Sequence, residues 1–299
     1  METFLTVTDF LLLLFWVRLW SQPDRELYFN PFLSAPTRLT DRVLDFLRPA
    51  LPLPRRLMAL LLLLFLLVFR AVALNHFRAE TPWVITLGSV LAFSPREPGV
   101  PGALTFSALH FLFFIVHYWG VYVLIQLLTP IKRRDRASEA FRFAALPLSA
   151  LNRWLQLLML AVITSGLVYG LAQCGSLALQ TLPGLPAPQS SLQASAETAH
   201  RLLFYGGLTI LSMTDSLIAA TNLMFVFILG GLASLVLQNA LVAAVSNEGV
   251  NVLLGRFSRR MLMGMMDLTP IFYFFALGIA YTKICQGVLY LLSTLTKMI

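Results

Sequence analysis

The sequence predicts an all-α integral membrane protein with about six transmembrane helices. Hydrophobic residues make up 58% of the 299-residue chain and charged residues only 12%, about half the charged fraction of a soluble globular protein. Several apolar runs are long enough to cross a bilayer as helices, and 57–69 and 111–128 contain almost no polar side chain. Basic, proline-containing segments separate these runs, so the chain reads as spans joined by interfacial segments.

The charge and the cysteines exclude several other classes of protein. A net charge of +8 in a soluble chain suggests nucleic acid, but here the positive-inside rule explains it more simply, and we expect no nucleic-acid partner. Cys174 and Cys285 both lie in apolar segments and match neither a metal-binding spacing nor a secreted disulfide pattern. We therefore expect two ordinary core cysteines, no bound metal and no cofactor.

The first span is expected at 4–20, where Asp9 and Arg18 are the only charges. Arg18 lies near the end of the run, where a long side chain can reach the membrane surface. No basic segment precedes this span and no small-residue cleavage site follows it, so we expect that it is not a cleaved signal peptide.

The next segment, 23–56, is too short and too charged to cross a membrane. Its apolar residues recur at helical spacing with arginines and acids between them, which predicts an amphipathic helix lying in the membrane interface. Prolines at 49, 52 and 54 are expected to end this helix. The arginines expected to face lipid headgroups are Arg38, Arg42 and Arg48. The apolar side chains expected to be embedded are Phe32, Leu39 and Leu47.

Five further spans are expected at 57–75, 104–128, 151–173, 216–246 and 270–293. The run 216–246 is longer than a bilayer requires, and Gly230-Gly231 offers a place for it to bend.

The segments between these spans differ in character. The apolar stretch from Trp83 to Phe93 is too short to cross and is expected to be re-entrant or interfacial. Residues 181–199, rich in proline, serine and glutamine, predict a loop, and Leu202–Leu211 a short surface helix. A third amphipathic segment is expected at Val250–Met266.

The order of span, basic amphipathic segment, proline and span occurs three times. In each unit an arginine precedes the proline by eleven positions, and the pairs are Arg38/Pro49, Arg136/Pro147 and Arg259/Pro270. The outer two units also share an asparagine at the same place before the arginine. Asn30, followed by Pro31, is a good start signal for a helix, because asparagine caps a helix N-terminus and proline fits its first turn.

The first unit resembles the YggT family, whose pattern is a span ending in an arginine-rich turn, then Asn-Pro, then a short helix closing with Arg-Pro. The matching stretches are Arg18-Leu19-Trp20, Tyr28-Phe29-Asn30-Pro31-Phe32, Thr37-Arg38-Leu39-Thr40-Asp41 and Leu47-Arg48-Pro49. The second unit departs from the pattern, because Val252 follows Asn251 where proline is expected and Thr269 precedes Pro270 where arginine is expected.

The resemblance implies an enlarged relative of the family, which contains one or two such units. The expected organisation is a first YggT-like unit over 1–80, a re-entrant or external loop over 81–103, a middle helical hairpin with a basic amphipathic segment over 104–175, an external loop over 176–215 and a second YggT-like unit over 216–299. From the resemblance and the arginine chemistry, we expect sites for lipid or partner binding. These residues are Asn30, Pro31, Arg38, Asp41, Arg42, Arg48, Pro49, Asn251, Arg259, Arg260 and Pro270.

His110 and His117 form a possible intramembrane polar site, because seven residues separate them on one face of a span. Membrane histidines are often functional. A spacing of seven gives only about 10 Å of rise, too little for haem ligands near different leaflets. We favour a structural role over a proton or cofactor role.

The sequence also contains no Gly-x-Ser-x-Gly, no His-Glu-x-x-His and no phosphate loop, so we expect no enzymatic activity.

The distribution of basic residues predicts topology. Lys and Arg number six in 23–56, six in 132–153 and three in 247–269, whereas the loops 76–103 and 176–215 contain two and one. The three basic segments should therefore be cytoplasmic and both termini periplasmic, in the inner membrane that the YggT resemblance implies.

Two functions remain open from the sequence. The first is a non-enzymatic scaffold or assembly protein that contacts anionic lipid headgroups and other membrane proteins; YggT relatives are linked to assembly of b-type cytochromes, nucleoid partition and cell division. The alternative is a transporter or channel component for cation balance under osmotic stress, because bacterial members are linked to osmotic tolerance and cation uptake. Spans of nearly pure Leu, Phe, Val and Ala favour the scaffold.

Overall fold

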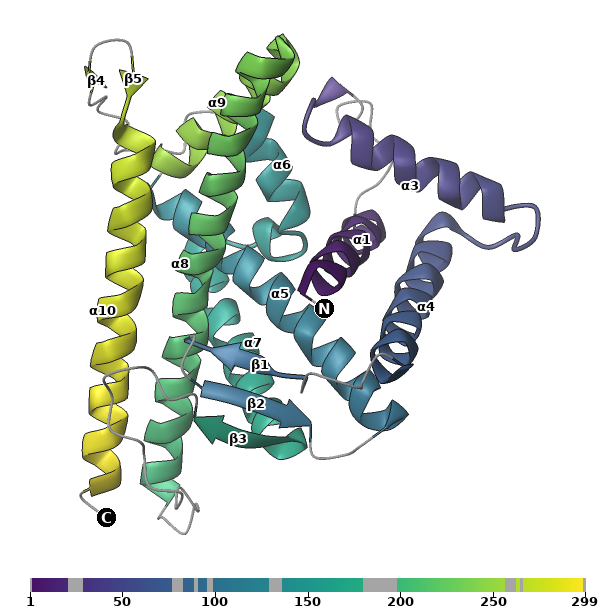
Figure 1. Ribbon diagram of the computed structural model, residues 1–299. Coiled ribbons are helices and arrows are strands. Elements are labelled where there is room, and N and C mark those ends of the chain that lie inside the picture. Colours follow the sequence, from purple (N-terminus) through teal and green to yellow (C-terminus); the bar gives the residue numbers. More distant parts are fainter. Residues whose placement is uncertain are drawn as a thin grey trace. The chain divides into compact units, whose positions relative to one another are not determined.

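The computed structural model describes residues 2–20, 29–76, 83–88, 91–95, 99–128, 136–179, 198–255, 262–263 and 266–297 (Figure 1). Its helices in chain order are α1 (Glu2–Trp20), α3 (Ser34–Leu47), α4 (Arg55–His76), α5 (Val100–Leu128), α6 (Arg136–Ala144), α7 (Arg153–Cys174), α8 (Thr198–Leu237), α9 (Ala240–Leu254) and α10 (Thr269–Lys297). The strands are β1 (Ile85–Leu87), β2 (Leu91–Pro95), β3 (Gly175–Leu179), β4 (Leu262–Met263) and β5 (Met266–Asp267).

Within these residues, six helices are long and apolar enough to cross a membrane. The corresponding segments are Thr3–Trp20, Arg55–His76, Val100–Leu127, Arg153–Cys174, Leu203–Ser234 and Thr269–Leu292. The predicted all-α fold with six transmembrane helices is therefore confirmed.

The expected limits of the fifth span were wrong. Leu202–Leu211 is not a separate surface helix, because α8 runs without interruption from Thr198 to Leu237. The chain breaks at Gln238, whose φ is 49°, and not at Gly230-Gly231. Asn239 then begins α9 by accepting hydrogen bonds from the backbone N–H groups of Leu241 and Val242.

The chain divides into two compact units, each assembled from three separate stretches. Unit 1 comprises Met1–Leu67, Val121–Leu157 and Ala220–Ala276, and unit 2 comprises Val68–Gly120, Leu158–Ala219 and Leu277–Ile299. The dividing points fall inside α4, α5, α7, α8 and α10, so each of these helices contributes one part to each unit.

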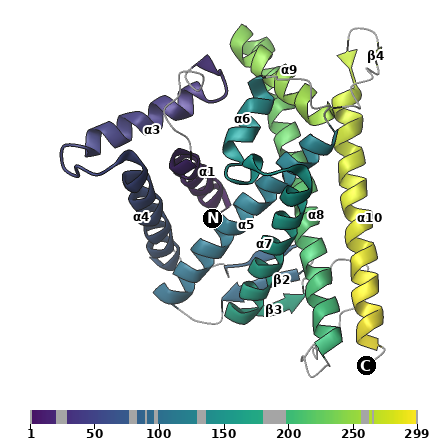
Figure 2. The same cartoon turned by 180° about the vertical axis from the view of Figure 1, so that it is seen from behind.

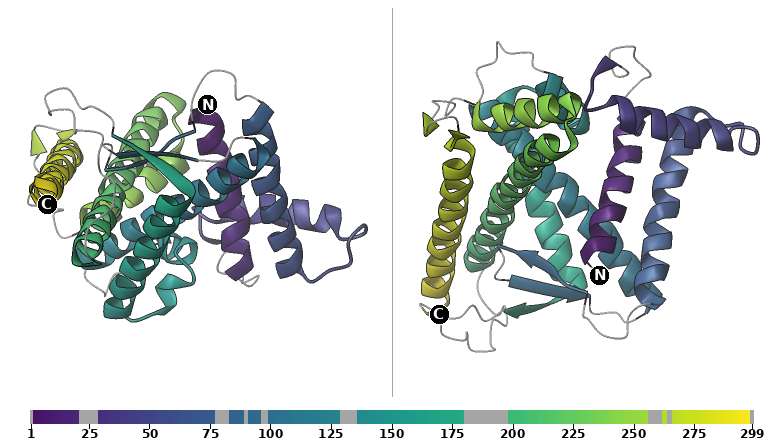
Figure 3. Two further views of the ribbon diagram at one scale, coloured as in Figure 1. Left: turned by 90° about the horizontal axis from the view of Figure 1, so that it is seen from below. Right: turned by 45° about the horizontal axis from the view of Figure 1, so that its top comes forward.

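In unit 1, α3 lies crosswise to α1 and to the first part of α4 (Figures 1 and 3). Helix α1 contacts α3 and α6, and α6 contacts α9. Leu33, in the turn before α3, packs on Ala140 of α6, and Phe32 and Phe143 cover this contact. Phe32 also meets Phe227 of α8 edge to face, with ring centroids 6.4 Å apart.

Unit 2 contains an antiparallel three-stranded sheet in the order β1-β2-β3. Strands β1 and β2 pair with Leu87 opposite Leu91, and β2 pairs with β3 with Pro95 opposite Gly175. The stretch from Trp83 to Phe93, expected to be re-entrant or interfacial, thus contributes a β-hairpin. Seen from behind, α7 leads directly into β3 (Figure 2).

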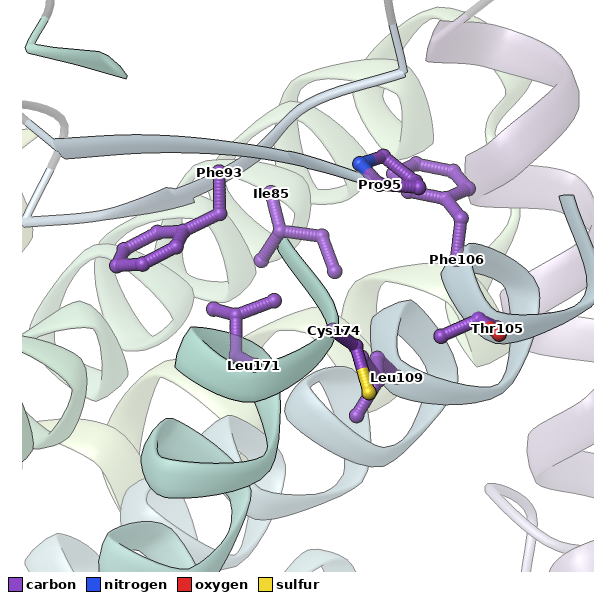
Figure 4. Close-up of a pocket in the computed structure, with 8 residues that line it drawn as sticks. All are labelled: Ile85, Phe93, Pro95, Thr105, Phe106, Leu109, Leu171 and Cys174. Atoms are coloured by element: carbon purple, nitrogen blue, oxygen red, sulfur yellow. The ribbon is translucent and has the colours of Figure 1, made fainter. Parts of the chain in front are cut away.

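The sheet buries one apolar face. Ile85, Leu87 and Phe93 are nearly inaccessible to solvent, as alternation along short strands requires. A small recess beneath the hairpin is lined by Ile85, Phe93, Pro95, Thr105, Phe106, Leu109, Leu171 and Cys174 (Figure 4). Its lining is almost entirely apolar, so we regard it as a packing feature of the sheet.

One close helix contact gives a test of the packing in unit 1. A Cβ at Gly249 of α9 would lie 2.6 Å from the ring of Phe227, which is itself packed against Phe32. Gly249→Ala should therefore destabilise the protein by about 1–3 kcal/mol, measured as a lower thermal unfolding temperature in detergent. Gly166→Ala is the matched control, because a Cβ there meets nothing within 4 Å. Equal behaviour of the two variants would contradict this packing.

Candidate functional site

The α3 helix, within unit 1, has a buried face and an exposed apolar stripe. Thr37, Thr40 and Leu44 are buried against the rest of the unit. Leu39 and Phe46 form an exposed apolar stripe, with 51% and 83% of their surfaces accessible. Because the apolar stripe is exposed beside polar residues, α3 has the pattern of a helix lying at a boundary between apolar and aqueous surroundings.

The three arginines expected to face headgroups are all exposed. Arg38 and Arg42 lie one turn apart on α3, and Arg48 follows its last residue, next to exposed Pro49. Leu39 is also exposed, whereas Leu47 is only partly so and Phe32 packs inside the unit. The exposed apolar stripe therefore consists of Leu39 and Phe46, and Phe32 is not part of it.

A buried ion pair holds α3 to α1. The guanidinium of Arg18 donates to Oδ1 of Asp41, and the side chains are only 5% and 13% exposed. A second pair, Arg55 with Asp45 at 3.1 Å, is largely exposed and links α3 to the start of α4. Exposed pairs contribute about 0–1 kcal/mol, whereas breaking a buried pair is costly because it leaves an uncompensated charge.

Asn30 connects the first of the three sequence repeats to the middle one. Its side-chain oxygen accepts the N–H of Phe32 at 3.0 Å, and its side-chain nitrogen donates to the carbonyl of Arg136 at 2.8 Å. The first contact is the local cap expected from the Asn30-Pro31 dipeptide. The second contact joins α6 to the turn before α3, and Asn30 is 5% exposed.

Glu248 connects the middle sequence repeat to the third. The sequence reasoning did not identify this residue. Its Oε1 accepts the N–H of Ala137, in the first turn of α6, at 3.0 Å. A carboxylate at a helix N-terminus satisfies a free N–H and interacts favourably with the helix dipole. The sequence did offer a signal, because Glu248 is the only acidic residue of α9.

The remaining expected residues are only partly placed. Asn251 is exposed on α9, where its carbonyl accepts the N–H of Gly255. Pro270 is partly buried in the first turn of α10. Arg259 and Arg260 lie outside the described residues.

His110 and His117 both belong to unit 2, on α5. The Nε2 atom of His117 lies 3.4 Å from Oγ of Ser212 and 3.9 Å from a carboxylate oxygen of Asp215, both on α8. His110 stacks obliquely on Phe106, with ring centroids 5.4 Å apart. The described residues contain no group of three or more His, Cys, Asp or Glu side chains that could hold a metal ion.

The sequence reasoning missed Asp215, because it placed this residue at the end of a loop. The available signal was an acidic residue directly followed by a long apolar run.

A scan against protein-family models finds no match for the chain, and searches of curated proteins and of solved structures find no match either.

The buried ion pair gives a test of how α3 is held. Asp41→Asn keeps the side-chain volume but leaves Arg18 buried without its counter-charge, so the free energy of unfolding should fall by about 3 kcal/mol. Asp45→Asn, which breaks only the exposed pair with Arg55, should change it by less than about 1 kcal/mol. Thermal unfolding of both variants in one detergent compares them; a larger loss for Asp45→Asn would refute this account.

Proposed function

We propose that the protein is a non-enzymatic scaffold of the membrane, an enlarged relative of the YggT family that binds anionic lipid headgroups and other integral membrane proteins through its interfacial helices. The observation that supports the proposal is the exposed surface of α3. One face of this helix is buried in unit 1, while an apolar stripe and three arginines remain exposed.

The chemistry of α3 suits a headgroup layer. Arginine binds phosphate oxygens bidentately, and Arg38 and Arg42 present two guanidinium groups one helical turn apart. Leu39 and Phe46 supply apolar surface for the acyl chains or for a partner helix. The buried pair of Arg18 with Asp41 fixes the orientation of α3, which reduces the entropy lost on binding.

The spans also present apolar surface to their surroundings. In unit 1, Phe65 of α4, Val226 of α8 and Phe275 of α10 are all more than half exposed. Such surfaces contact lipid or the helices of another membrane protein, and this supports lateral docking.

We place the protein in the bacterial inner membrane, with the three basic segments in the cytoplasm and both termini in the periplasm. The distribution of lysine and arginine between the loops supports this orientation.

Substitution of the exposed arginines tests the lipid-binding role. In Arg38→Gln/Arg42→Gln/Arg48→Gln, the ratio of anionic to zwitterionic lipid that co-purifies in mild detergent should fall several-fold. Each basic residue near an anionic surface contributes about 1 kcal/mol, or roughly fivefold. Mass spectrometry of the retained lipid measures the ratio, and thermal unfolding shows that the bundle is intact.

The matched variant Leu39→Gln/Phe46→Gln keeps the charges and removes the apolar stripe. It should retain the preference for anionic lipid but lose total lipid or a co-purifying membrane partner. If neither variant alters retained lipid or partners, α3 is a connector and the proposal fails.

The orientation has its own test. A single cysteine introduced at Ser190, in a background carrying Cys174→Ser and Cys285→Ser, should react with an impermeant maleimide on spheroplasts before permeabilisation. A cysteine at Ala50, which is exposed just after α3, should react only afterwards. The reverse pattern would overturn the proposed orientation.

A second candidate is a component of cation transport under osmotic stress. The observation in its favour is Asp215, a mostly buried carboxylate within a membrane span. A selective cation flux into sealed proteoliposomes that disappears on Asp215→Asn would favour this function over the scaffold.

A further inference from the structure

The strongest unassigned feature of the molecule is the environment of Asp215 in unit 2. This residue lies on α8, and its side chain is 12% exposed. Groups from three other elements surround its carboxylate: α5, α10 and the turn between β1 and β2. All of these residues belong to unit 2.

Two hydrogen-bond donors hold the carboxylate. The backbone N–H of Gly88 lies 3.1 and 3.0 Å from its two oxygens, and the hydroxyl of Tyr281 donates to Oδ1 at 3.1 Å. Gly88 has a φ of +63°, and a Cβ there would lie 2.9 Å from Leu211. Glycine is therefore favoured at this turn, because other residues rarely adopt its backbone conformation.

The third neighbour is His117. Its Nε2 atom lies 3.9 Å from Oδ2 of Asp215 and 3.4 Å from Oγ of Ser212. When Nε2 carries a proton it can donate to the Ser212 hydroxyl, and when it carries none it can accept from that hydroxyl. The carboxylate oxygen, at 3.9 Å, lies within ion-pair distance but beyond a hydrogen bond. The imidazole thus lies close enough for its charge to act on the carboxylate, without a hydrogen bond between the two side chains.

The surroundings of this pair contain few other titratable groups. Among the described residues, those facing it are His110 on α5, beside His117, and Tyr281 and Cys285 on α10, with Thr214 of α8 lying 3.7 Å from the sulfur of Cys285. The described part of the hairpin, 83–88 and 91–95, contains no titratable side chain. Tyr281 lies near the middle of the span Thr269–Leu292, so its contact with Asp215 lies about half-way along that helix.

We propose that Asp215 and His117 form an intramembrane proton-binding site, in which the carboxylate or the imidazole binds one proton, the two groups lie within ion-pair distance of each other, and Gly88 and Tyr281 fix the carboxylate. The site holds a proton whether or not the protein moves it across the membrane, and it is independent of lipid binding by α3.

The donor set favours a proton over a metal cation. A hard cation needs several oxygen ligands around it, whereas two of the three neighbours of Asp215 present N–H and O–H donors to the carboxylate. A proton requires only one acceptor, and His117 is a second titratable group 3.9 Å away, whose charge acts on that of the carboxylate. Ionisable residues that meet within membrane spans commonly form such relays.

Infrared difference spectroscopy on the full-length protein in nanodiscs tests the site. Spectra are compared across a titration from about pH 4 to about pH 9. We expect a band of a protonated carboxylic acid that titrates and that is missing in Asp215→Asn. The matched control Asp45→Asn, which removes an exposed acid, should leave this band in place.

Two milder variants separate a proton site from a structural role. Tyr281→Phe removes one hydrogen bond and should change the frequency of the Asp215 band, and His117→Gln should change its titration midpoint. If Asp215→Asn does not fold, as judged by thermal unfolding, these two variants decide. An unchanged frequency and midpoint in both would overturn the proposal.

The choice of ion is tested by repeating the titration with sodium chloride and with choline chloride. A midpoint that is the same in both salts supports a proton site. A midpoint that moves with sodium concentration would mean that a metal cation competes for the carboxylate, and this would overturn the assignment to a proton alone. Persistence of the titrating band in folded Asp215→Asn would also overturn it.

Discussion

The ion pair between Arg18 and Asp41 is the contact on which the arrangement of unit 1 depends. It joins the end of a membrane span to a helix that lies crosswise to it, and both side chains are mostly removed from solvent. A charge in such a place costs several kcal/mol unless a partner compensates it. The pair therefore specifies one position of α3 against α1. This specified position leaves Arg38, Arg42 and Phe46 on the outside, which is the basis of the proposed lipid and partner contacts.

The middle repeated unit has a role in the structure that its sequence did not indicate. Asn30 of the first sequence repeat donates to the carbonyl of Arg136, and Glu248 of the third repeat accepts the N–H of Ala137, the next residue. Two successive residues at the start of α6 thus tie together segments more than one hundred residues away on either side. The Glu248 contact also satisfies a free N–H at the start of α6, so it stabilises the helix as well as joining its neighbours.

The sequence predicted the fold from composition and periodicity, and it predicted parts of the site. Long apolar runs determine spans because lipid leaves the backbone no partner outside its own helix, so the spans around Phe65 and Phe275 were predictable. The end of α8 was not predictable. Gln238 stops the helix by its backbone conformation and Asn239 caps the next one, inside a run that is otherwise apolar. Asp215 was missed for a different reason: its importance depends on Gly88, Tyr281 and His117, which are distant in sequence and have no shared pattern.

The hairpin formed by β1 and β2 has a physical reason at this place in a helical protein. Inside a helix every backbone N–H is bonded to a carbonyl of the same helix, so a span cannot offer a backbone donor to a neighbour. A turn can. The N–H of Gly88 lies free of the ladder between Leu87 and Leu91 and points at both oxygens of Asp215. The strands then satisfy their own backbone groups by pairing with each other and with β3. A small sheet is therefore a way to bring one backbone donor to a buried carboxylate.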